Sequence, residues 1–137
     1  MITEAENRAD WDEFIKSHPE ANFLQSWDFY EFHKARGKQI VRRILTRDGK
    51  IIAAYAGVVE TAKRGTYLAI AGGPILDWKD EKIVQEVFTD IKEVGKRKKC
   101  AFVRVRPQLP LSDESLKLMR ILGLVKAPMY LSVEYAG

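Results

Sequence analysis

Residues 40–59 read Ile40-Val-Arg-Arg-Ile-Leu-Thr-Arg-Asp-Gly-Lys-Ile-Ile-Ala-Ala-Tyr-Ala-Gly-Val-Val59. Asp48-Gly49 lies between two runs rich in β-branched residues, and Asp-Gly in that position is a strong signal for a β-hairpin. We therefore expect antiparallel strands at residues 40–46 and 51–59. A second turn, Lys63-Arg64-Gly65, leads to a third strand at residues 66–71, so the three strands form an antiparallel meander.

Two helices are expected before the meander. In the first, Asp10 is the expected N-cap, Glu13 is placed to bond back to it, and the helix ends before Pro19. Its apolar positions recur at helical spacing and predict one buried stripe, formed by Trp11, Phe14, Ile15 and His18. In the second helix, Ser26 is the expected N-cap and Gly37 supplies the stop.

The residues after the meander predict two more helices and two more strands. A long helix begins at Asp80 and has one apolar face, formed by Ile83, Val84, Val87, Ile91 and Val94. A strand at residues 101–106 alternates, with Ala101, Val103 and Val105 on one face and Phe102, Arg104 and Arg106 on the other. A short helix from Ser112 to Gly123 precedes a strand at residues 129–135. The order αα-βββ-α-β-α-β predicts an α+β fold: a mixed, mostly antiparallel sheet with helices on both faces, compatible with the acetyltransferase-like (GNAT) architecture.

Length and composition indicate one globular domain over residues 1–137. The content is 46% hydrophobic and 31% charged, and no apolar run approaches the roughly 18–20 residues that span a bilayer. The first residues lack the order of a signal peptide. Cys100 is the single cysteine, which excludes an internal disulfide and suits a reducing compartment, so we expect a cytoplasmic protein.

Positive charge is concentrated just before and within the hairpin. Residues 33–50 carry seven basic residues against one acid, Asp48, in a chain whose net charge is +4. Two interpretations remain open: a solvated basic face, or a site for an anion such as phosphate, carboxylate or nucleic acid. The seven basic residues are Lys34, Arg36, Lys38, Arg42, Arg43, Arg47 and Lys50.

No complete catalytic set is found in the sequence, and the catalytic residues stay unknown. His18 and His33 are not at metal-ligand spacing with each other or with Cys100, so no metal site is predicted. His18 and Cys100 are interpreted as structural. Nucleophile-elbow and phosphate-loop motifs are absent. Pro74 lacks an N–H where an acetyltransferase would hold the pyrophosphate of coenzyme A, so no cofactor is expected.

Two segments together resemble the FemA/FemB/FemX family of peptidoglycan-bridge aminoacyltransferases. They are Phe23-Leu-Gln-Ser-Trp-Asp-Phe-Tyr-Glu-Phe-His-Lys-Ala-Arg-Gly37 and Gly72-Gly-Pro-Ile-Leu-Asp77. Phe102-Val-Arg-Val-Arg-Pro107 is similar to a further family strand. The resemblance implies the first of two acetyltransferase-like domains. It implies substrate contacts from Trp27, Tyr30, His33, Lys34, Arg36, Gly73, Pro74, Asp77 and Arg104.

The chain departs from the family pattern at four of these places. Phe29 stands where tryptophan is usual, and His33 stands where lysine is frequent. Gly72 replaces a basic residue before Gly-Pro, and Arg106 replaces a residue that is often acidic. A neutral imidazole attracts phosphate less than an ammonium does, although Lys34 or Arg36 would substitute.

Each motif also has a purely structural interpretation. The aromatic helix is either buried on several sides or partly offered to a ligand or another domain. Gly73-Pro74 is either a tight turn or a segment that exposes backbone to a ligand while Asp77 accepts a hydrogen bond. Arg104 either pairs with a carboxylate or contacts substrate.

The leading functional hypothesis is the acceptor-binding half of an enzyme that moves an amino acid from aminoacyl-tRNA to a peptidoglycan-precursor stem peptide. The implied partners are a UDP-linked or lipid-linked muramyl peptide and aminoacyl-tRNA. The tRNA would bind through a second acetyltransferase-like domain or a homodimer, and the isolated chain would be inactive. The alternatives are a stand-alone N-acyltransferase that uses acyl-CoA and a basic nucleic-acid-binding module.

Overall fold

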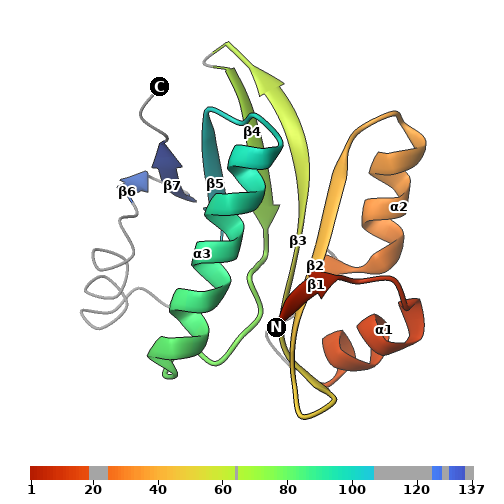
Figure 1. The fold of residues 1–137 in the computed structure, drawn as a ribbon. Coiled ribbons are helices and arrows are strands. Elements are labelled where there is room, and N and C mark those ends of the chain that lie inside the picture. The colour runs from red at the N-terminus through yellow and green to blue at the C-terminus, as the bar shows by residue number, and fades with distance from the viewer. Residues whose placement is uncertain (19–24, 64, 107–124, 128–129, 135–137) are drawn as a thin grey trace.

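The computed structural model describes residues 1–18, 25–63, 65–106, 125–127 and 130–134 (Figure 1). Within these ranges the chain forms seven strands and three helices. In chain order they are β1 (Ile2–Glu4), α1 (Arg8–Lys16), α2 (Trp27–Ala35), β2 (Ile40–Arg47), β3 (Lys50–Ala62), β4 (Gly65–Ala71), α3 (Glu81–Arg97), β5 (Phe102–Arg106), β6 (Val125–Ala127) and β7 (Tyr130–Glu134). The short helix expected from Ser112 to Gly123 lies outside the described residues.

All seven strands belong to one sheet with the order β1-β2-β3-β4-β5-β7-β6. The pair β4 and β5 is parallel, and the other described pairs are antiparallel. The predicted mixed, mostly antiparallel sheet is therefore confirmed. The three-residue strands β1 and β6 were not expected, because so few residues give no readable alternation of polar and apolar side chains.

The hairpin between β2 and β3 forms as its turn residues predict. Asp48 and Gly49 have φ angles of 54° and 77°, and a two-residue hairpin turn of type I′ needs positive φ at both positions. The pairing continues down to Arg47 and Lys50 at the turn, so both strands reach one residue closer to it than predicted. Beyond Val59, β3 continues to Ala62 because its register with β4 continues to that residue.

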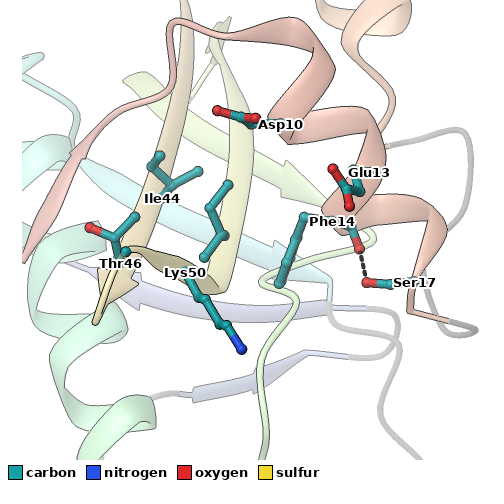
Figure 2. Close-up of a pocket in the computed structure, with 9 residues that line it drawn as sticks. Asp10, Glu13, Phe14, Ser17, Ile44, Thr46 and Lys50 are labelled. Carbon is teal, nitrogen blue, oxygen red and sulfur yellow. Dashed lines mark hydrogen bonds between the residues drawn. The ribbon is translucent and has the colours of Figure 1, made fainter.

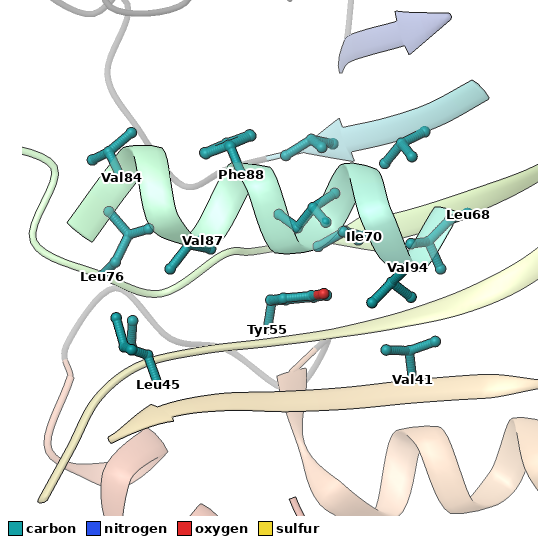
Figure 3. Close-up of a cluster of buried hydrophobic side chains, with 14 of the residues drawn as sticks. Val41, Leu45, Tyr55, Leu68, Ile70, Leu76, Val84, Val87, Phe88 and Val94 are labelled. Carbon is teal, nitrogen blue, oxygen red and sulfur yellow. The ribbon is translucent and has the colours of Figure 1, made fainter. Parts of the chain in front are cut away.

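Helices cover both faces of the sheet, as predicted, and β3 is an interior strand between β2 and β4 (Figure 1). Ala53 and Tyr55 of β3 belong to a core cluster that contains the apolar face of α3 (Figure 3). The alternate residues Ala54 and Ala56 belong to a second cluster, together with side chains of α1 and α2. The expected face of α3 is buried at all five positions, Ile83, Val84, Val87, Ile91 and Val94.

The structure confirms Ser26 as a helix cap and the start of the long helix at Asp80, while the cap predicted at Asp10 is wrong. Ser26 accepts a hydrogen bond from the Phe29 N–H at 3.1 Å, and Asp80 is the N-cap of α3. The cap of α1 is Asn7 rather than Asp10, because the Asn7 side-chain oxygen accepts from the Asp10 N–H at 3.0 Å. Asp10 therefore lies in the first turn of the helix.

The helix α1 ends at Lys16, and the predicted stripe packs on the sheet. Trp11 and Phe14 are buried, while Ile15 is half-buried. His18 follows the helix and packs its ring on Phe14 at 4.2 Å between centroids, which gives it the structural place that was expected. On β5, Val103 and Val105 share one face as predicted, and that face is buried, whereas Ala101 precedes the strand and is exposed.

A buried ionic cluster joins α3 to the sheet. Asp90 is 7% exposed and accepts a 2.6 Å hydrogen bond from the Tyr55 hydroxyl. The Arg43 guanidinium binds the same carboxylate through two nitrogens, at 2.8 Å and 3.1 Å. A forked guanidinium contact of this kind fixes orientation as well as charge. It anchors the helix against β2 and β3.

Candidate functional site

The side chain of Gln25 joins the start of α2 to the segment that follows β4. Gln25 is fully buried, and its Nε2 donates to the Ala71 carbonyl oxygen at 2.6 Å. Its Oε1 accepts from the Ala56 N–H at 2.9 Å, and Nε2 lies 3.3 Å from the Ala56 carbonyl oxygen. The carboxamide thus bonds to the main chain of both β3 and β4.

Gln25 fills a place where the pairing between these two strands opens. Val58 pairs with Ala69, and the next pair is the bridge between Ala54 and Ile75. Three residues of β3 (55–57) therefore face five residues (70–74) on the other side. An opening of this size leaves peptide groups without strand partners, and buried peptide groups must be bonded. The Gln25 amide supplies those bonds.

Gly73 and Pro74 lie in this opening and are both buried. The peptide bond between them is cis. A Cβ on Gly73 would lie 3.0 Å from the Gln25 amide, a tight contact, so the close approach of these two residues favours glycine. Gly73 packs against Gln25, and the positive φ that the tight-turn interpretation expects of a glycine occurs at Gly72, at 75°. Because Gly73 and Pro74 are buried, the expectation that they contact substrate does not fit this structure. Gln25 was missed as a candidate residue because it was noted only within the segment from Phe23 to Gly37.

The backbone after β4 offers few donors for an anion. The Gly72 N–H donates to the Arg106 carbonyl oxygen at 2.8 Å and the Ile75 N–H donates to the Ala54 carbonyl oxygen at 2.8 Å, while Pro74 has no N–H. The strands β4 and β5 stay paired up to Ala71 and Arg106, so they do not separate there. A pyrophosphate cradle needs consecutive N–H groups that point at the ligand.

Asp77 is exposed beyond this segment. Its Oδ1 accepts a hydrogen bond from the Lys79 N–H at 3.0 Å, which is a local turn contact. The exposed carboxylate retains further lone pairs, so it can accept from a hydroxyl or amide of a ligand.

Trp27 is half-buried at the start of α2, beneath a buried arginine. The Arg42 guanidinium lies 3.6 Å from the centroid of the Trp27 ring and donates to the Trp27 carbonyl oxygen at 3.0 Å. Arg42 is 7% exposed, pairs with Glu31 at 3.5 Å, and its Nε finds no partner among the described residues. Burial lowers the pKa of Arg42. Stacking and the carbonyl contact hold the indole in place.

Tyr30 has a structural place. It is 1% exposed, and its hydroxyl donates to the Ala56 carbonyl oxygen at 3.0 Å, next to the Gln25 amide. Burial raises the pKa of Tyr30 well above its ordinary value, so the phenol stays neutral. Because its polar atom is used inside the protein, the expectation that Tyr30 contacts substrate does not fit this structure.

The rest of α2 is exposed to different degrees. Phe32 is 56% exposed, and the Arg36 guanidinium lies 5.5 Å from its ring centroid. His33 is half-buried, meets Phe29 edge to face at 4.7 Å, and has no described partner at Nδ1. The aromatic helix is therefore buried on one side and open on the other, so both interpretations of it hold in part.

Lys34 lines a hollow of about 420 Å³ at the far end of α2. At about 1.5 Å rise per residue, Lys34 lies roughly 10 Å along the axis from Trp27. Trp27 and Lys34 therefore mark two groups of predicted contacts at opposite ends of α2, although Arg42, which stacks on Trp27, also lines the hollow. The hollow is lined by Glu4, Ala5, Glu6, Lys34, Lys38, Gln39, Ile40, Arg42 and Lys98.

Arg104 lies apart from both groups, on β5. Its guanidinium is 4.7 Å from the ring centroid of Tyr67, which stacks on Phe102 at 4.9 Å with an interplanar angle of 6°. In the parallel pairing of β4 and β5, Arg104 lies opposite Ala69. The sheet face with Arg104 is the one that also carries Ala54 and Ala56, since Val103 and Val105 point to the α3 core.

Several of the basic residues at 33–50 have partners within the protein. Lys38 pairs with Glu60, Arg43 with Asp90 and Glu4, and Arg47 with Glu86 at 3.4 Å. Arg42 pairs with Glu31. Much of this charge is thus balanced internally, which weakens the interpretation of residues 33–50 as one continuous anion-binding face.

A second hollow, of about 470 Å³, separates α1 from the hairpin (Figure 2). Phe14 and Ile44 line it on the apolar side, and Asp10 and Glu13 supply carboxylates. It contains none of the predicted substrate contacts, and its carboxylates would repel an anionic ligand.

The described residues contain no group of three or more histidine, cysteine or acidic side chains placed to hold a metal ion. Cys100 is 6% exposed, and burial raises the pKa of its thiol, as suits a structural cysteine. Among the helices in the described ranges, none is long and apolar enough to cross a membrane.

Comparison with solved structures shows the fold. The chain superposes on FemX with a TM-score of 0.80 at 21% identity, covering 91% of this chain and 32% of FemX. An acetyltransferase of the GNAT family from Streptococcus pneumoniae gives a TM-score of 0.67 at 12% identity, covering 98% and 99% of the two chains. The acetyltransferase-like architecture is confirmed.

Sequence comparison shows the family. The aminoacyltransferase FemA of Staphylococcus aureus (strain MW2) is 26% identical over 99 residues, which are 71% of this chain and 24% of FemA. The chain therefore spans about a quarter of the length of the curated relatives it matches. The model of the FemAB family matches residues 6–121, and the chain belongs to that family.

Proposed function

We propose that this chain is the acceptor-binding half of an aminoacyltransferase in peptidoglycan cross-bridge synthesis. The chain would work with a second acetyltransferase-like domain or a second copy, in the cytoplasm. The observation that carries the proposal is the FemAB family match over residues 6–121, most of the described chain. The match of 71% of this chain to FemA supports the same activity.

The substrate we propose is a UDP-linked or lipid-linked muramyl peptide. Trp27 and the exposed Asp77, which follows the buried Gly73-Pro74 turn, would form one end of the site. Lys34 and Arg36 would meet the diphosphate at the other end of α2, where His33 replaces the lysine that is frequent in the family. An extended five-residue stem peptide reaches about 17 Å, so one acceptor is long enough to contact both groups.

The proposed chemistry needs little covalent catalysis. An aminoacyl ester is already activated, so the acceptor amine attacks the ester carbonyl and the tRNA hydroxyl leaves. The protein contributes by holding the two substrates in register and by stabilising the oxyanion. The aminoacyl-tRNA would bind to the second domain or copy.

Chemical-shift mapping of the labelled chain with a UDP-linked muramyl pentapeptide tests the proposal. We expect shifts at Trp27, Lys34, Arg36 and Asp77, and no aminoacyl transfer by the isolated chain. An absence of shifts at millimolar ligand would refute the acceptor-binding role. Variants at Lys34 and at Lys50 form a matched pair, because both lysines are exposed and Lys50 lies on the hairpin beside the other hollow.

A second candidate is a stand-alone N-acyltransferase that uses acyl-CoA. The near-complete coverage of a GNAT acetyltransferase favours it. The paired ends of β4 and β5 and the engaged N–H groups of Gly72 and Ile75 favour the aminoacyltransferase instead. Calorimetry with acetyl-CoA separates the two, and a micromolar dissociation constant would reverse this order.

A further inference from the structure

We propose that Gln25 is a positioning residue that fixes the backbone of residues 73–77, which carries the exposed Asp77, relative to α2 in the acceptor site. This inference rests on the proposed function, since it explains how the segment of residues 73–77 and helix α2 keep one arrangement relative to each other. Gln25 itself is fully buried and would not touch the substrate. It acts through the backbone on either side of it.

The segment of residues 73–77 is held through the main chain of β4. The Gln25 Nε2 donates to the Ala71 carbonyl oxygen at 2.6 Å, two residues before Gly73. The carboxamide also lies against Gly73 itself, where a Cβ would come within 3.0 Å of it. Contact and hydrogen bond together leave the Gly73 backbone little freedom to move toward β3.

Helix α2 is held through β3. Ala56 bonds to the Gln25 amide through its N–H at 2.9 Å, and its carbonyl oxygen accepts from the Tyr30 hydroxyl at 3.0 Å. Tyr30 belongs to α2, and Trp27 begins that helix two residues after Gln25. One carboxamide therefore links the helix that carries Trp27, the strand β3, and the segment that follows β4.

The orientation of the amide is chemically determined. Its oxygen faces an N–H donor on Ala56, and its nitrogen faces the carbonyl oxygens of Ala56 and Ala71. A carboxylate in the same place would bring an oxygen against two carbonyl oxygens. An apolar side chain of similar length would leave the Ala56 N–H and the Ala71 carbonyl oxygen without these bonds.

Three variants test the role of Gln25. Gln25→Glu keeps the shape, Gln25→Met keeps the length without the amide, and Gln25→Ala removes the contact with Gly73. The control is Val87→Ala, a large-to-small change buried on α3 at the other face of the sheet. Each variant is studied at a temperature at which circular dichroism shows it to be folded, so Gln25→Met serves if Gln25→Ala does not fold.

The first readout is the dissociation constant for a UDP-linked muramyl pentapeptide. We expect the Gln25 variants to weaken binding at least tenfold and Val87→Ala to change it less than twofold. Equal affinity in the wild type and in Gln25→Met would overturn the proposal. An equal loss in Val87→Ala would also overturn it, because general destabilisation would then explain the effect.

The second readout does not depend on the ligand. Amide hydrogen exchange at Ala56 and Ile75 should accelerate at least tenfold in Gln25→Met relative to Val87→Ala, since the opening between β3 and β4 would lose its bonds. Unchanged exchange would refute the positioning role even where the ligand binds. If the wild type binds no muramyl peptide while amide exchange still accelerates in Gln25→Met, the proposed function fails, but Gln25 still fixes the segment of residues 73–77.

Discussion

Replacing Asp90 by alanine should destabilise the protein strongly, although Asp90 lies far from the proposed substrate contacts. The carboxylate is 7% exposed and binds Arg43 through two nitrogens and Tyr55 through its hydroxyl. Removing it leaves the Arg43 guanidinium, whose side chain is 11% exposed, with only the exposed Glu4 carboxylate at 3.3 Å. The Tyr55 hydroxyl loses its partner in the core as well.

The expected loss is about 3–5 kcal/mol of the free energy of unfolding. That range is typical for breaking a buried ion pair by removing one partner, because the remaining charge stays desolvated. A domain of this size has roughly 5–15 kcal/mol in total, so about a fifth or more of its stability depends on this carboxylate. Urea denaturation followed by tryptophan fluorescence measures the difference from the shift of the midpoint.

A matched control is Glu86→Ala, which also breaks an ion pair between α3 and β2. Glu86 and Arg47 have side chains that are 39% and 51% exposed, so their pair should contribute no more than about 1 kcal/mol. If Asp90→Ala and Glu86→Ala destabilised the protein equally, the buried cluster would not anchor α3. Asp90→Asn should fall between them, since it keeps the shape and loses the charge.

Three further predictions concern buried groups. Burial raises the pKa of Tyr30 and Tyr55 in the folded state, so the unfolded chain releases protons first; the free energy of unfolding should fall as the pH rises above about 10, and Tyr30→Phe should make the fall shallower in alkaline urea titrations. Burial also raises the pKa of Cys100, and a thiol-specific reagent at pH 8 should label it at least tenfold more slowly in the native state than in urea. Gly73→Ala should cost about 1–3 kcal/mol through its clash with Gln25, and a smaller cost in the Gln25→Ala background would be seen as coupling in a double-mutant cycle of urea midpoints.

Local sequence signals predicted most of the fold, because they act over few residues. The Asp48-Gly49 turn, the Ser26 and Asp80 caps and the apolar face of α3 each depend on spacings of one to four residues. Such patterns are readable without knowledge of the tertiary structure. Asn7 shows the limit of this approach, since Asn7 and Asp10 are both suitable caps and only the path of the chain from β1 selects between them.

Contacts between distant residues could not be predicted in the same way. Asp90 lies on the buried side of α3, where the sequence pattern predicts an apolar residue. Its partners Arg43 and Tyr55 come opposite it only when β2 and β3 pair in the folded sheet. Gln25 bonds to residues 31 and 46 positions away. Neither sequence separation has a characteristic pattern, so the residues that hold the structure together were overlooked while their exposed neighbours were noticed.

The candidate site was predicted unevenly for the same reason. Lys34, Arg36 and Asp77 are exposed, which a substrate contact requires. Tyr30 was expected to contact substrate because it belongs to an aromatic helix, yet its position in that helix turns it toward β3. Arg42 was considered only as one of the basic residues at 33–50, although its guanidinium stacks on the ring of Trp27 and so supports a proposed substrate contact.

The division of labour between Tyr30 and Trp27 suggests how the aromatic helix serves both stability and binding. Residues three apart on a helix lie on neighbouring parts of its surface, so one can face the core while the other lies at its margin. Tyr30 is sealed by its bond to Ala56, and this fixes the rotation of α2 about its axis. The Arg42 guanidinium, which stacks on the Trp27 ring and bonds to the Trp27 carbonyl oxygen, then keeps this indole in one orientation at the edge of the site. A binding surface that is rigid before the ligand binds loses less conformational entropy on binding. This suits a protein whose proposed task is to hold an acceptor in register.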